Sequence, residues 1–376
     1  MSFRRTVFWF HLVIGVGAGL VIFLLAVTGA LLSFETQVIA AVDRAGLPAI
    51  SAGAPLGASA LAGAALNATA GKATALVIPA DPVAPVAASL GRGAQVYLDP
   101  VTGAVLGPGN AGVRGFFGMV EDLHRWLALS DASRDTGRAI TGATNLVFLL
   151  LLLSGLWLWL PPRLGWPMLR QRLVFRRGLP NAKARDWNWH HVFGIWAWLA
   201  LLLIVGSGVV LSYPAARTAV FAAFGETAGR GGPPGAAVPS GTPVADPRLD
   251  AVLVAATAAD PDWNRLTLPI PATGADSVTV TLDTGSGRNP RAQTRLTYDL
   301  YGAALTRRSG FADTAPGQKT FVFLRFGHTG EIFGLAGQAV AVLASLAAAV
   351  MVWTGLALTW RRLLQPLLRR RRARAG

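Results

Sequence analysis

The stretch FHLVIGVGAGLVIFLLAVTGALLSF, residues 10–34, decides the fold class of this chain. It carries no Asp, Glu, Lys or Arg, and about 20 mostly apolar residues are enough for a helix to cross a bilayer. Three further stretches of this kind follow, at roughly 139–160, 190–213 and 333–360. Hydrophobic residues make up 52% of the chain, and its mean hydropathy is +0.46. We therefore predict a membrane protein built on an all-α four-helix bundle.

The two long intervals between apolar runs predict two small α+β domains. The first contains ALVIPA (75–80) and AQVYLDPVTGAVLG (94–107), and the second contains DSVTVTLDTG (276–285) and TRLTYDLYGAALT (294–306). Their alternating apolar residues are typical of strands, and an Asp and a Gly in each turn are typical of tight connections. Both intervals thus share a strand, turn and strand pattern.

The two halves of the chain resemble each other, which predicts an internal parallel repeat. The first and third runs align at an offset of 179 residues, so that His11 matches His190. The second and fourth runs align at an offset of 200, and Ser154 then matches Thr354. The predicted order is helix 1–35, outer domain 36–138 with the His124 segment, helix 139–160, basic loop 161–189, helix 190–213, outer domain 214–332, helix 333–360 and basic tail 361–376.

Basic residues indicate how the chain crosses the membrane. The net charge is +15, and 16 of the 34 Lys and Arg residues lie in the short segments 1–7, 161–189 and 361–376. By the positive-inside rule, both termini and the middle loop are expected in the cytoplasm, next to anionic lipid. This distribution argues against nucleic acid as a partner.

The absence of cysteine excludes several redox centres. Covalent c-type haem attachment, thiolate-ligated iron–sulfur clusters and disulfides all need cysteine. A redox centre in this chain would therefore be a bound cofactor with other ligands.

The five histidines are the most informative single residues. His11 and His190 begin the first and third runs, whereas His124 and His328 precede the second and fourth. Imidazole can supply both axial ligands of a haem iron, so two histidines near each membrane face suggest two bis-histidine haems. The alternative is that amphipathic histidines collect at helix ends near the interface without binding a cofactor. His191 points about 100° away from His190 around the helix, and it could instead meet a haem propionate or the lipid headgroups.

The chain resembles the PepSY-associated transmembrane proteins, often called iron-regulated membrane proteins. The resemblance rests on FHLVIG and TGALLSFE in the first run, LHRWLAL (123–129), GRAITG with LLSGLWLW, HHVFGIW with GSGVVLSYP, and HTGEIFGLAGQ with TGLALTW. The paired YLDPVTG and TYDLYG turns look like those of PepSY modules. The similarity covers nearly the whole chain. An arginine is common in the family where His191 stands, and the second turn lacks the Pro and Thr of the first.

The resemblance implies a four-helix protein of the bacterial inner membrane with PepSY-like periplasmic domains. Some members are siderophore-iron reductases with two b-type haems. Carried onto this sequence, His11 and His190 would ligate the haem on the cytoplasmic side, and His124 and His328 the haem on the periplasmic side. Electrons would come from a cytoplasmic flavin reductase or from quinol, and would reduce a ferric siderophore or another periplasmic iron chelate to release Fe(II).

Several arginines near the outer histidines are candidates for binding haem propionates or an anionic chelate, because guanidinium binds carboxylates with two hydrogen bonds. Arg125 is the foremost of these, and a solvated interfacial arginine is the alternative. The full set is Arg114, Arg125, Arg134, Arg138 and Arg325.

Two other functions remain open from the sequence. One is a transporter of iron, haem or siderophore, although the centres of the four runs carry almost no charge. The other is a non-redox membrane protein whose PepSY-like domains bind a partner protein. No Walker A, GxSxG, HExxH or Rossmann motif is present, which suggests a separate electron donor.

Overall fold

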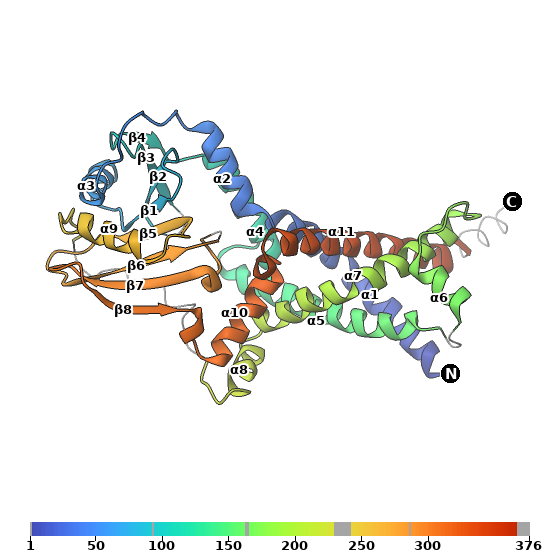
Figure 1. The fold of residues 1–376 in the computed structure, drawn as a ribbon. Helices are drawn as coiled ribbons and strands as arrows, with labels where there is room; N and C mark the ends of the chain where they lie inside the picture. Colours follow the sequence, from blue (N-terminus) through green and yellow to red (C-terminus); the bar gives the residue numbers. More distant parts are fainter. Residues whose placement is uncertain (1, 92–93, 162–164, 229–241, 286, 367–376) are drawn as a thin grey trace. The chain divides into compact units, whose positions relative to one another are not determined.

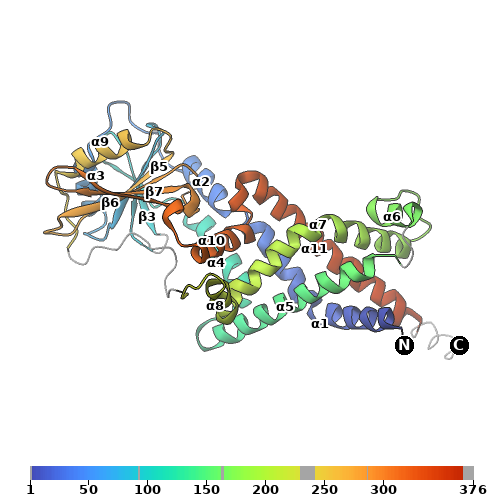
Figure 2. The same ribbon diagram turned by 60° about the horizontal axis from the view of Figure 1, so that its bottom comes forward.

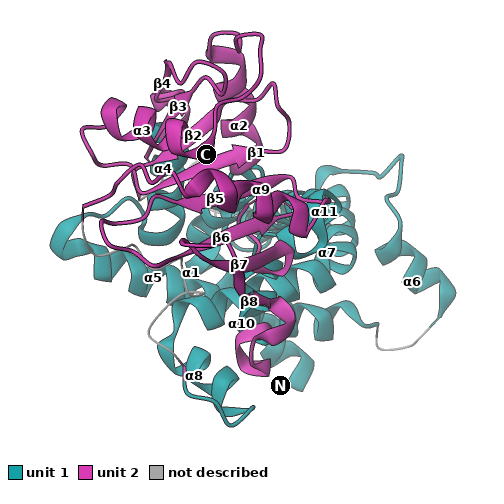
Figure 3. Cartoon of the chain, turned by 60° about the vertical axis from the view of Figure 1, so that its left-hand side comes forward, with its two compact units in different colours: residues 1–35, 115–227, 320–376 teal, residues 36–114, 228–319 magenta. Residues whose placement is uncertain are grey.

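The computed structural model describes residues 2–366 except 92–93, 162–164, 229–241 and 286. These residues form two compact units, coloured teal and magenta in Figure 3. We call residues 1–35, 115–227 and 320–376 the helical unit, and residues 36–114 and 228–319 the sheet unit. The chain passes between the two units four times, so each unit is assembled from segments far apart in the sequence.

The helical unit contains four helices that are long and apolar enough to cross a membrane, as predicted. They are α1 (Phe3–Leu32), α5 (Arg134–Trp159), α7 (Ala182–Ser212) and α11 (Gly334–Thr359). Helix α7 begins eight residues before the predicted run, because Asn181 caps it by accepting a hydrogen bond from the Ala184 amide at 2.9 Å. The four helices run side by side in Figures 1 and 2.

Packing in the bundle sets which helices face each other. Helix α1 packs against α5 and α11, and α7 packs against the same two helices, so α1 and α7 lie diagonally across the bundle. The buried centre includes Leu201 of α7 with Ala344 and Ala348 of α11, small residues that allow backbones to approach closely. Large apolar side chains such as Leu20 and Leu199 are 78% and 73% exposed, as expected of a surface that meets lipid.

The structure also contains shorter helices in both units. Helices α4 (Ala111–Trp126) and α10 (Pro316–His328) carry His124 and His328 and lead into α5 and α11. The others are α2 (Glu35–Gly46), α3 (Ala58–Ala68), α6 (Trp166–Leu173), α8 (Pro214–Ala222) and α9 (Leu249–Ala259). Single helical turns occupy Asp131–Ser133, Pro290–Ala292, Phe311–Asp313, Glu331–Phe333 and Trp360–Leu364.

The sheet unit contains one eight-stranded antiparallel sheet in the order β4-β3-β2-β1-β5-β6-β7-β8. Its strands are β1 (Ala75–Pro79), β2 (Val86–Ser89), β3 (Gln95–Leu98), β4 (Val105–Gly107), β5 (Arg265–Pro269), β6 (Ser277–Asp283), β7 (Gln293–Asp299) and β8 (Leu305–Gly310). The two intervals that the sequence assigns to separate domains share this sheet, because β1 pairs with β5 over five residues. The pairing hides an edge of each half, and exposed edges invite aggregation.

Helices α3 and α9 cover one face of the sheet and form its core. Leu61 and Leu249 pack with the buried strand residues Leu76, Leu268 and Leu296. Asp250 of α9 also caps the start of α3, since its carboxylate accepts hydrogen bonds from the Ser59 amide at 2.9 Å and from the Ser59 hydroxyl. The two helices are thereby fixed to each other as well as to the sheet.

The two predicted Asp turns have closely similar hydrogen bonds. The Asp99 amide donates to the Ala104 carbonyl, and the Asp299 amide donates to the Ala304 carbonyl, both at 2.9 Å. Gly103 follows Asp99 with φ +72°, whereas Ala303 takes the matching left-handed conformation with φ +50°. Burial would raise the pKa of Asp99, but backbone hydrogen bonds from Ser51, Val101 and Thr102 lower it to about 2.

A buried ion pair ties α2 to the start of α4. The Asp43 side chain is 2% exposed and accepts hydrogen bonds from the Arg114 guanidinium, the Tyr97 hydroxyl at 2.8 Å and the Asn110 amide at 2.6 Å. Burial would raise the pKa of Asp43, but these donors lower it below its ordinary value. Arg114 thus holds the first turn of the helix that carries His124.

Candidate functional site

Two of the predicted histidines lie near one end of the bundle, and we call them the His11 layer. His11 on α1 places its Nδ1 atom 2.9 Å from Ser154 Oγ on α5. His190 on α7 places its Nδ1 atom 3.0 Å from Thr354 Oγ1 and 3.1 Å from the Met351 carbonyl oxygen, both on α11. The two half-buried imidazoles are close enough to interact electrostatically.

The other two histidines form the His124 layer near the opposite end. His124 Nδ1 lies 2.8 Å from Thr28 Oγ1 on α1. His328 Nδ1 lies 2.7 Å from the Ile204 carbonyl oxygen and 3.3 Å from Ser207 Oγ, both on α7. The ring centres of His124 and His328 are 6.3 Å apart, and their planes meet at 63°. The structure therefore brings together the pairs that the sequence grouped.

All four histidines share one hydrogen-bonding pattern. Each Nδ1 atom meets the hydroxyl of a Ser or Thr on one of the long helices, and each of these hydroxyls also donates to the carbonyl four residues earlier in its own helix. The hydroxyl hydrogen is therefore engaged, so the oxygen is left to accept from the imidazole Nδ1–H. The hydroxyl residues are Thr28, Ser154, Ser207 and Thr354.

This pattern fixes the tautomer of the rings. A carbonyl oxygen can only accept, so the Met351 and Ile204 carbonyls require a hydrogen on Nδ1 of His190 and His328. The engaged hydroxyls impose the same requirement on His11 and His124. With Nδ1 protonated, Nε2 carries the lone pair, which is the state that a metal ligand needs.

A glycine follows each of the four hydroxyl residues, and three of these glycines lie against a ring. A Cβ atom on Gly29 or Gly155 would lie 3.3 Å from Cε1 of His124 or His11, and one on Gly355 would lie 3.4 Å from Cε1 of His190. Such contacts are tight, so a larger residue would displace the imidazole. Gly208 differs, because its Cβ position faces the side chain of Asn145.

The two layers are separated along the bundle. His11 and Thr28 are 17 residues apart on α1, and His190 and Ser207 are 17 residues apart on α7. At 1.5 Å per residue, the layers lie about 26 Å apart along these helices. That separation is comparable to the roughly 30 Å thickness of a bilayer core.

The segment that carries His124 is held by a close corner between α4 and α5. The Thr141 hydroxyl donates to the Arg125 carbonyl at 3.0 Å, and a Cβ atom on Gly137 would overlap the Trp126 carbonyl oxygen. The connection includes Leu127 and Ala128, both with φ +55°, a conformation that costs energy for residues other than glycine. The fold thus tolerates local strain beside His124 to keep this corner tight.

The structure places the remaining candidates differently from the four histidines. His191 donates from Nδ1 to the Trp187 carbonyl of its own helix at 2.8 Å, and its ring lies 4.0 Å from that of Trp187. Arg125 is largely exposed, pairs with Glu121 at 2.7 Å and lies 4.3 Å from the centre of the Trp126 ring. Arg114 is engaged by Asp43.

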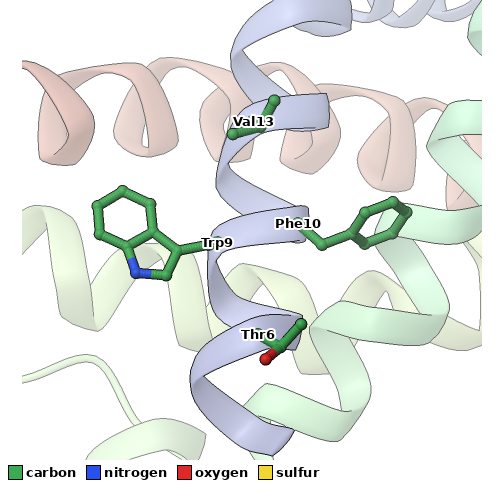
Figure 4. A pocket seen from close by; sticks show the side chains of 4 residues that line it. All are labelled: Thr6, Trp9, Phe10 and Val13. Atoms are coloured by element: carbon green, nitrogen blue, oxygen red, sulfur yellow. The ribbon is translucent and has the colours of Figure 1, made fainter. Parts of the chain in front are cut away.

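A shallow apolar pocket lies on α1 next to His11 in the sequence (Figure 4). Thr6, Trp9, Phe10 and Val13 line it, all from one helix. Because Phe10 and Val13 are 46% and 62% exposed, this pocket has the character of a lipid-facing surface.

The donor set fits haem better than a bare metal ion. In the part of the chain that the structure describes, no site gathers three or more His, Cys, Asp or Glu side chains. Two imidazoles are the complement of a porphyrin, which brings its own four equatorial nitrogens. The 6.3 Å between the His124 and His328 ring centres also suits two imidazoles on one ion, since imidazole–metal bonds are about 2 Å long.

The sequence repeat predicts that Ser154 matches Thr354, but it does not predict the contact of either hydroxyl with a histidine. A Ser-Gly or Thr-Gly dipeptide occurs in each apolar run, once in three of them and twice in the second, at Thr141–Gly142 and Ser154–Gly155. Two other glycines of the long helices, Gly15 and Gly194, face Leu151 and Met351 and not a histidine.

Comparison with known proteins assigns the family. The model of the family described as PepSY-associated TM region matches residues 8–362, nearly the whole chain. No curated protein matches the chain. The match includes all four histidines and their hydroxyl partners, and the chain therefore belongs to the PepSY-associated TM region family.

Proposed function

We propose that this protein binds two b-type haems and carries electrons across the bacterial inner membrane to a periplasmic ferric siderophore or similar iron chelate. The observation that carries the proposal is the repeated contact between each histidine Nδ1 and a helix hydroxyl. Four rings held in one tautomer, with four Nε2 lone pairs in two layers, are what two bis-histidine sites require.

Haem would supply one-electron redox chemistry when bound. His11 and His190 would hold one group, and His124 and His328 would hold the other. The four hydroxyls orient the imidazoles and would make Nε2 a stronger ligand for iron, because a hydrogen bond at Nδ1 raises the basicity of the ring. These hydroxyls belong to Thr28, Ser154, Ser207 and Thr354. The apolar helix faces exclude water from both sites.

His190 is the better candidate for the α7 ligand than His191. His190 shares the hydroxyl contact of the other three histidines, whereas His191 contacts only its own helix through Nδ1. His191 and Arg125 are instead placed to bind haem propionates or the headgroups nearby.

The sheet unit would lie in the periplasm, and both termini would lie in the cytoplasm, as the basic segments favour. The order of four strands in each half, with a helix before each set, supports two PepSY-like modules in a duplicated chain. The electron donor would be a cytoplasmic flavin reductase or quinol.

The substrate would be ferric iron in a chelate of hard oxygen ligands. Such ligands bind Fe(III) better than Fe(II), so reduction loosens the complex and releases iron without destroying the chelator. In this proposal the chain receives the chelate on the periplasmic side and the electron donor acts on the cytoplasmic side.

The test is a reduced-minus-oxidised visible spectrum of detergent-purified protein, with haem measured per chain. We expect two low-spin haems in the unmodified protein, one in His11→Ala or His190→Ala, one in His124→Ala or His328→Ala, and two in the matched control His191→Ala. Absence of haem after expression with ample haem supply would overturn the proposal and favour a transporter or a partner-binding protein. Loss of haem in His191→Ala but not in His190→Ala would show that His191, and not His190, is the ligand on α7.

A further inference from the structure

The face of the sheet opposite α3 and α9 carries an unusual group of cations on its C-terminal half. Register pairs Thr281 of β6 with Arg295 of β7, and Thr297 of β7 with Arg307 of β8. Side chains alternate between the two faces of a strand, and these four residues occupy the face opposite the buried Leu282 and Leu296. We call Thr281, Arg295, Thr297 and Arg307, together with Thr279 and Ser309, the arginine–threonine face.

The two arginines of this face form no ion pair within the described part of the chain, and the carboxylates on the same face, Asp283 and Asp299, occupy diagonal positions. Neither Arg295 nor Arg307 has a hydrogen-bond or ion-pair partner among the residues that the structure describes. They are diagonal neighbours on adjacent strands, at a backbone separation of about 7–8 Å. Two like charges at this spacing repel each other, so the arrangement gains stability from an anion that meets both.

The neighbouring hydroxyls extend the same site. Thr281 and Ser309 flank Arg295 on the adjacent strands, and Thr297 flanks Arg307. Thr279 lies beside Thr297, with their hydroxyl oxygens 3.0 Å apart. These side chains are partly exposed, except Arg307, which is exposed. Guanidinium groups next to hydroxyls suit a ligand with several carboxylate oxygens, because each arginine binds one carboxylate with two hydrogen bonds.

The opposite face of the same strand shows that this placement is specific. Arg308, next to Arg307, points to the face of α9 and pairs with Asp260 at 3.8 Å. Its guanidinium also reaches the Ala259 carbonyl at the end of α9. Arg308 is thus engaged within the fold, whereas Arg307 and Arg295 remain available to a ligand.

We propose that the arginine–threonine face binds an anionic ferric chelate that bears free carboxylates. This inference rests on the proposed function, since it names the substrate class of the same protein. The face acts as a receiving surface for the chelate before iron is reduced, and it selects polycarboxylate chelates over neutral ones by charge.

The test uses Ga(III)–citrate, which resembles Fe(III)–citrate in charge and ligands and is not reduced, so binding is measured apart from electron transfer. The purified full chain is titrated calorimetrically with this complex, and the Arg295→Gln/Arg307→Gln double variant is compared with Arg308→Gln. We expect the double variant to bind about tenfold or more weakly, as for lost charge-assisted contacts, and Arg308→Gln to bind within about twofold of the unmodified protein.

Several outcomes would overturn the inference. They are no binding to the unmodified protein, equal weakening in Arg308→Gln, and equal affinity for citrate without gallium. Haem content, measured on the same samples, separates this result from the proposed function. Gallium–citrate binding in a protein without haem would support the arginine–threonine face as a binding site and contradict the proposed electron transfer. Two haems per chain without gallium–citrate binding would support the proposed electron transfer and contradict the binding site.

Discussion

The Nδ1 atom of His124 lies 2.8 Å from the Oγ1 atom of Thr28, a residue 96 positions earlier in the chain. The contact links α4 to α1, and it is one of four contacts of the same kind. Because Thr28 also donates its hydrogen to the Leu24 carbonyl at 2.7 Å, the hydroxyl accepts from the imidazole. The orientation of His124 therefore depends on a helix that is not its sequence neighbour.

Removal of the Ser154 hydroxyl should weaken haem binding in the His11 layer more than removal of the Thr354 hydroxyl. Ser154 supplies the hydroxyl contact of His11, whereas His190 keeps the Met351 carbonyl when Thr354 is changed. We expect Ser154→Ala to lower haem affinity of the His11 layer about tenfold or more, and Thr354→Val to lower it less. Haem retention during dilution or dialysis measures the difference. Equal losses in the two variants would show that the carbonyl does not compensate.

The glycines beside the rings should not tolerate a side chain. We expect Gly155→Val and Gly29→Val to displace His11 and His124, because a Cβ atom would already lie 3.3 Å from each ring. The matched control is Gly17→Val on α1, since nothing lies within 4 Å of its Cβ position. Haem per chain and the thermal unfolding temperature should fall in the first two variants, by an overpacking cost of about 1–3 kcal/mol. A comparable loss in the control would assign the effect to general helix disruption.

Acid should destabilise the sheet unit through Asp99. The folded-state pKa of Asp99 is about 2 and its ordinary value is 3.8, so its ionised form stabilises the fold above about pH 4. That contribution is lost as the pH falls from about 4 to 2. We expect Asp99→Asn to be less stable at neutral pH and to lose less stability over this range than the unmodified protein. Thermal unfolding followed at several pH values gives both slopes, and parallel slopes would contradict the prediction.

The second Asp turn offers a stabilising change. Ala303 has φ +50°, and glycine adopts this conformation without the Cβ clash. We expect Ala303→Gly to raise the free energy of unfolding by up to about 1 kcal/mol, because a left-handed residue other than glycine costs about 1–2 kcal/mol and glycine returns part of this as chain entropy. Denaturant unfolding measures the change. Gly103→Ala is the converse variant, since its Cβ would lie 3.2 Å from that of Ala64, and it should be destabilised.

The sequence was sufficient for the features that depend on local pattern. Apolar length predicted the four long helices, and the Asp and Gly spacing predicted the strand pairs β3–β4 and β7–β8. The position of His11 and His190 at equivalent points of two runs also predicted which histidines lie in one layer. Each of these signals is contained in a short segment, so it could be recognised without the tertiary structure.

Other features depend on contacts between distant segments. Nothing in the sequence around Leu76 or Leu268 indicates that β1 would pair with β5, because either edge of each half could have joined the other. Likewise, Arg114 resembled the other arginines near His124, and only the fold brings it to Asp43. The hydroxyl contacts of the histidines were missed for the same reason, since each joins two helices.

The central position of the β1–β5 pair has a consequence for how the protein is made. The partner of β1 begins 186 residues after β1 ends, and at roughly 5–20 residues per second the ribosome needs about 10–40 s to reach it. During this time β1 is an open strand edge, and α7 must be inserted before the sheet can close. A chaperone that shields this edge during synthesis would therefore raise the yield of folded protein, although β1 is paired on both sides in the finished sheet.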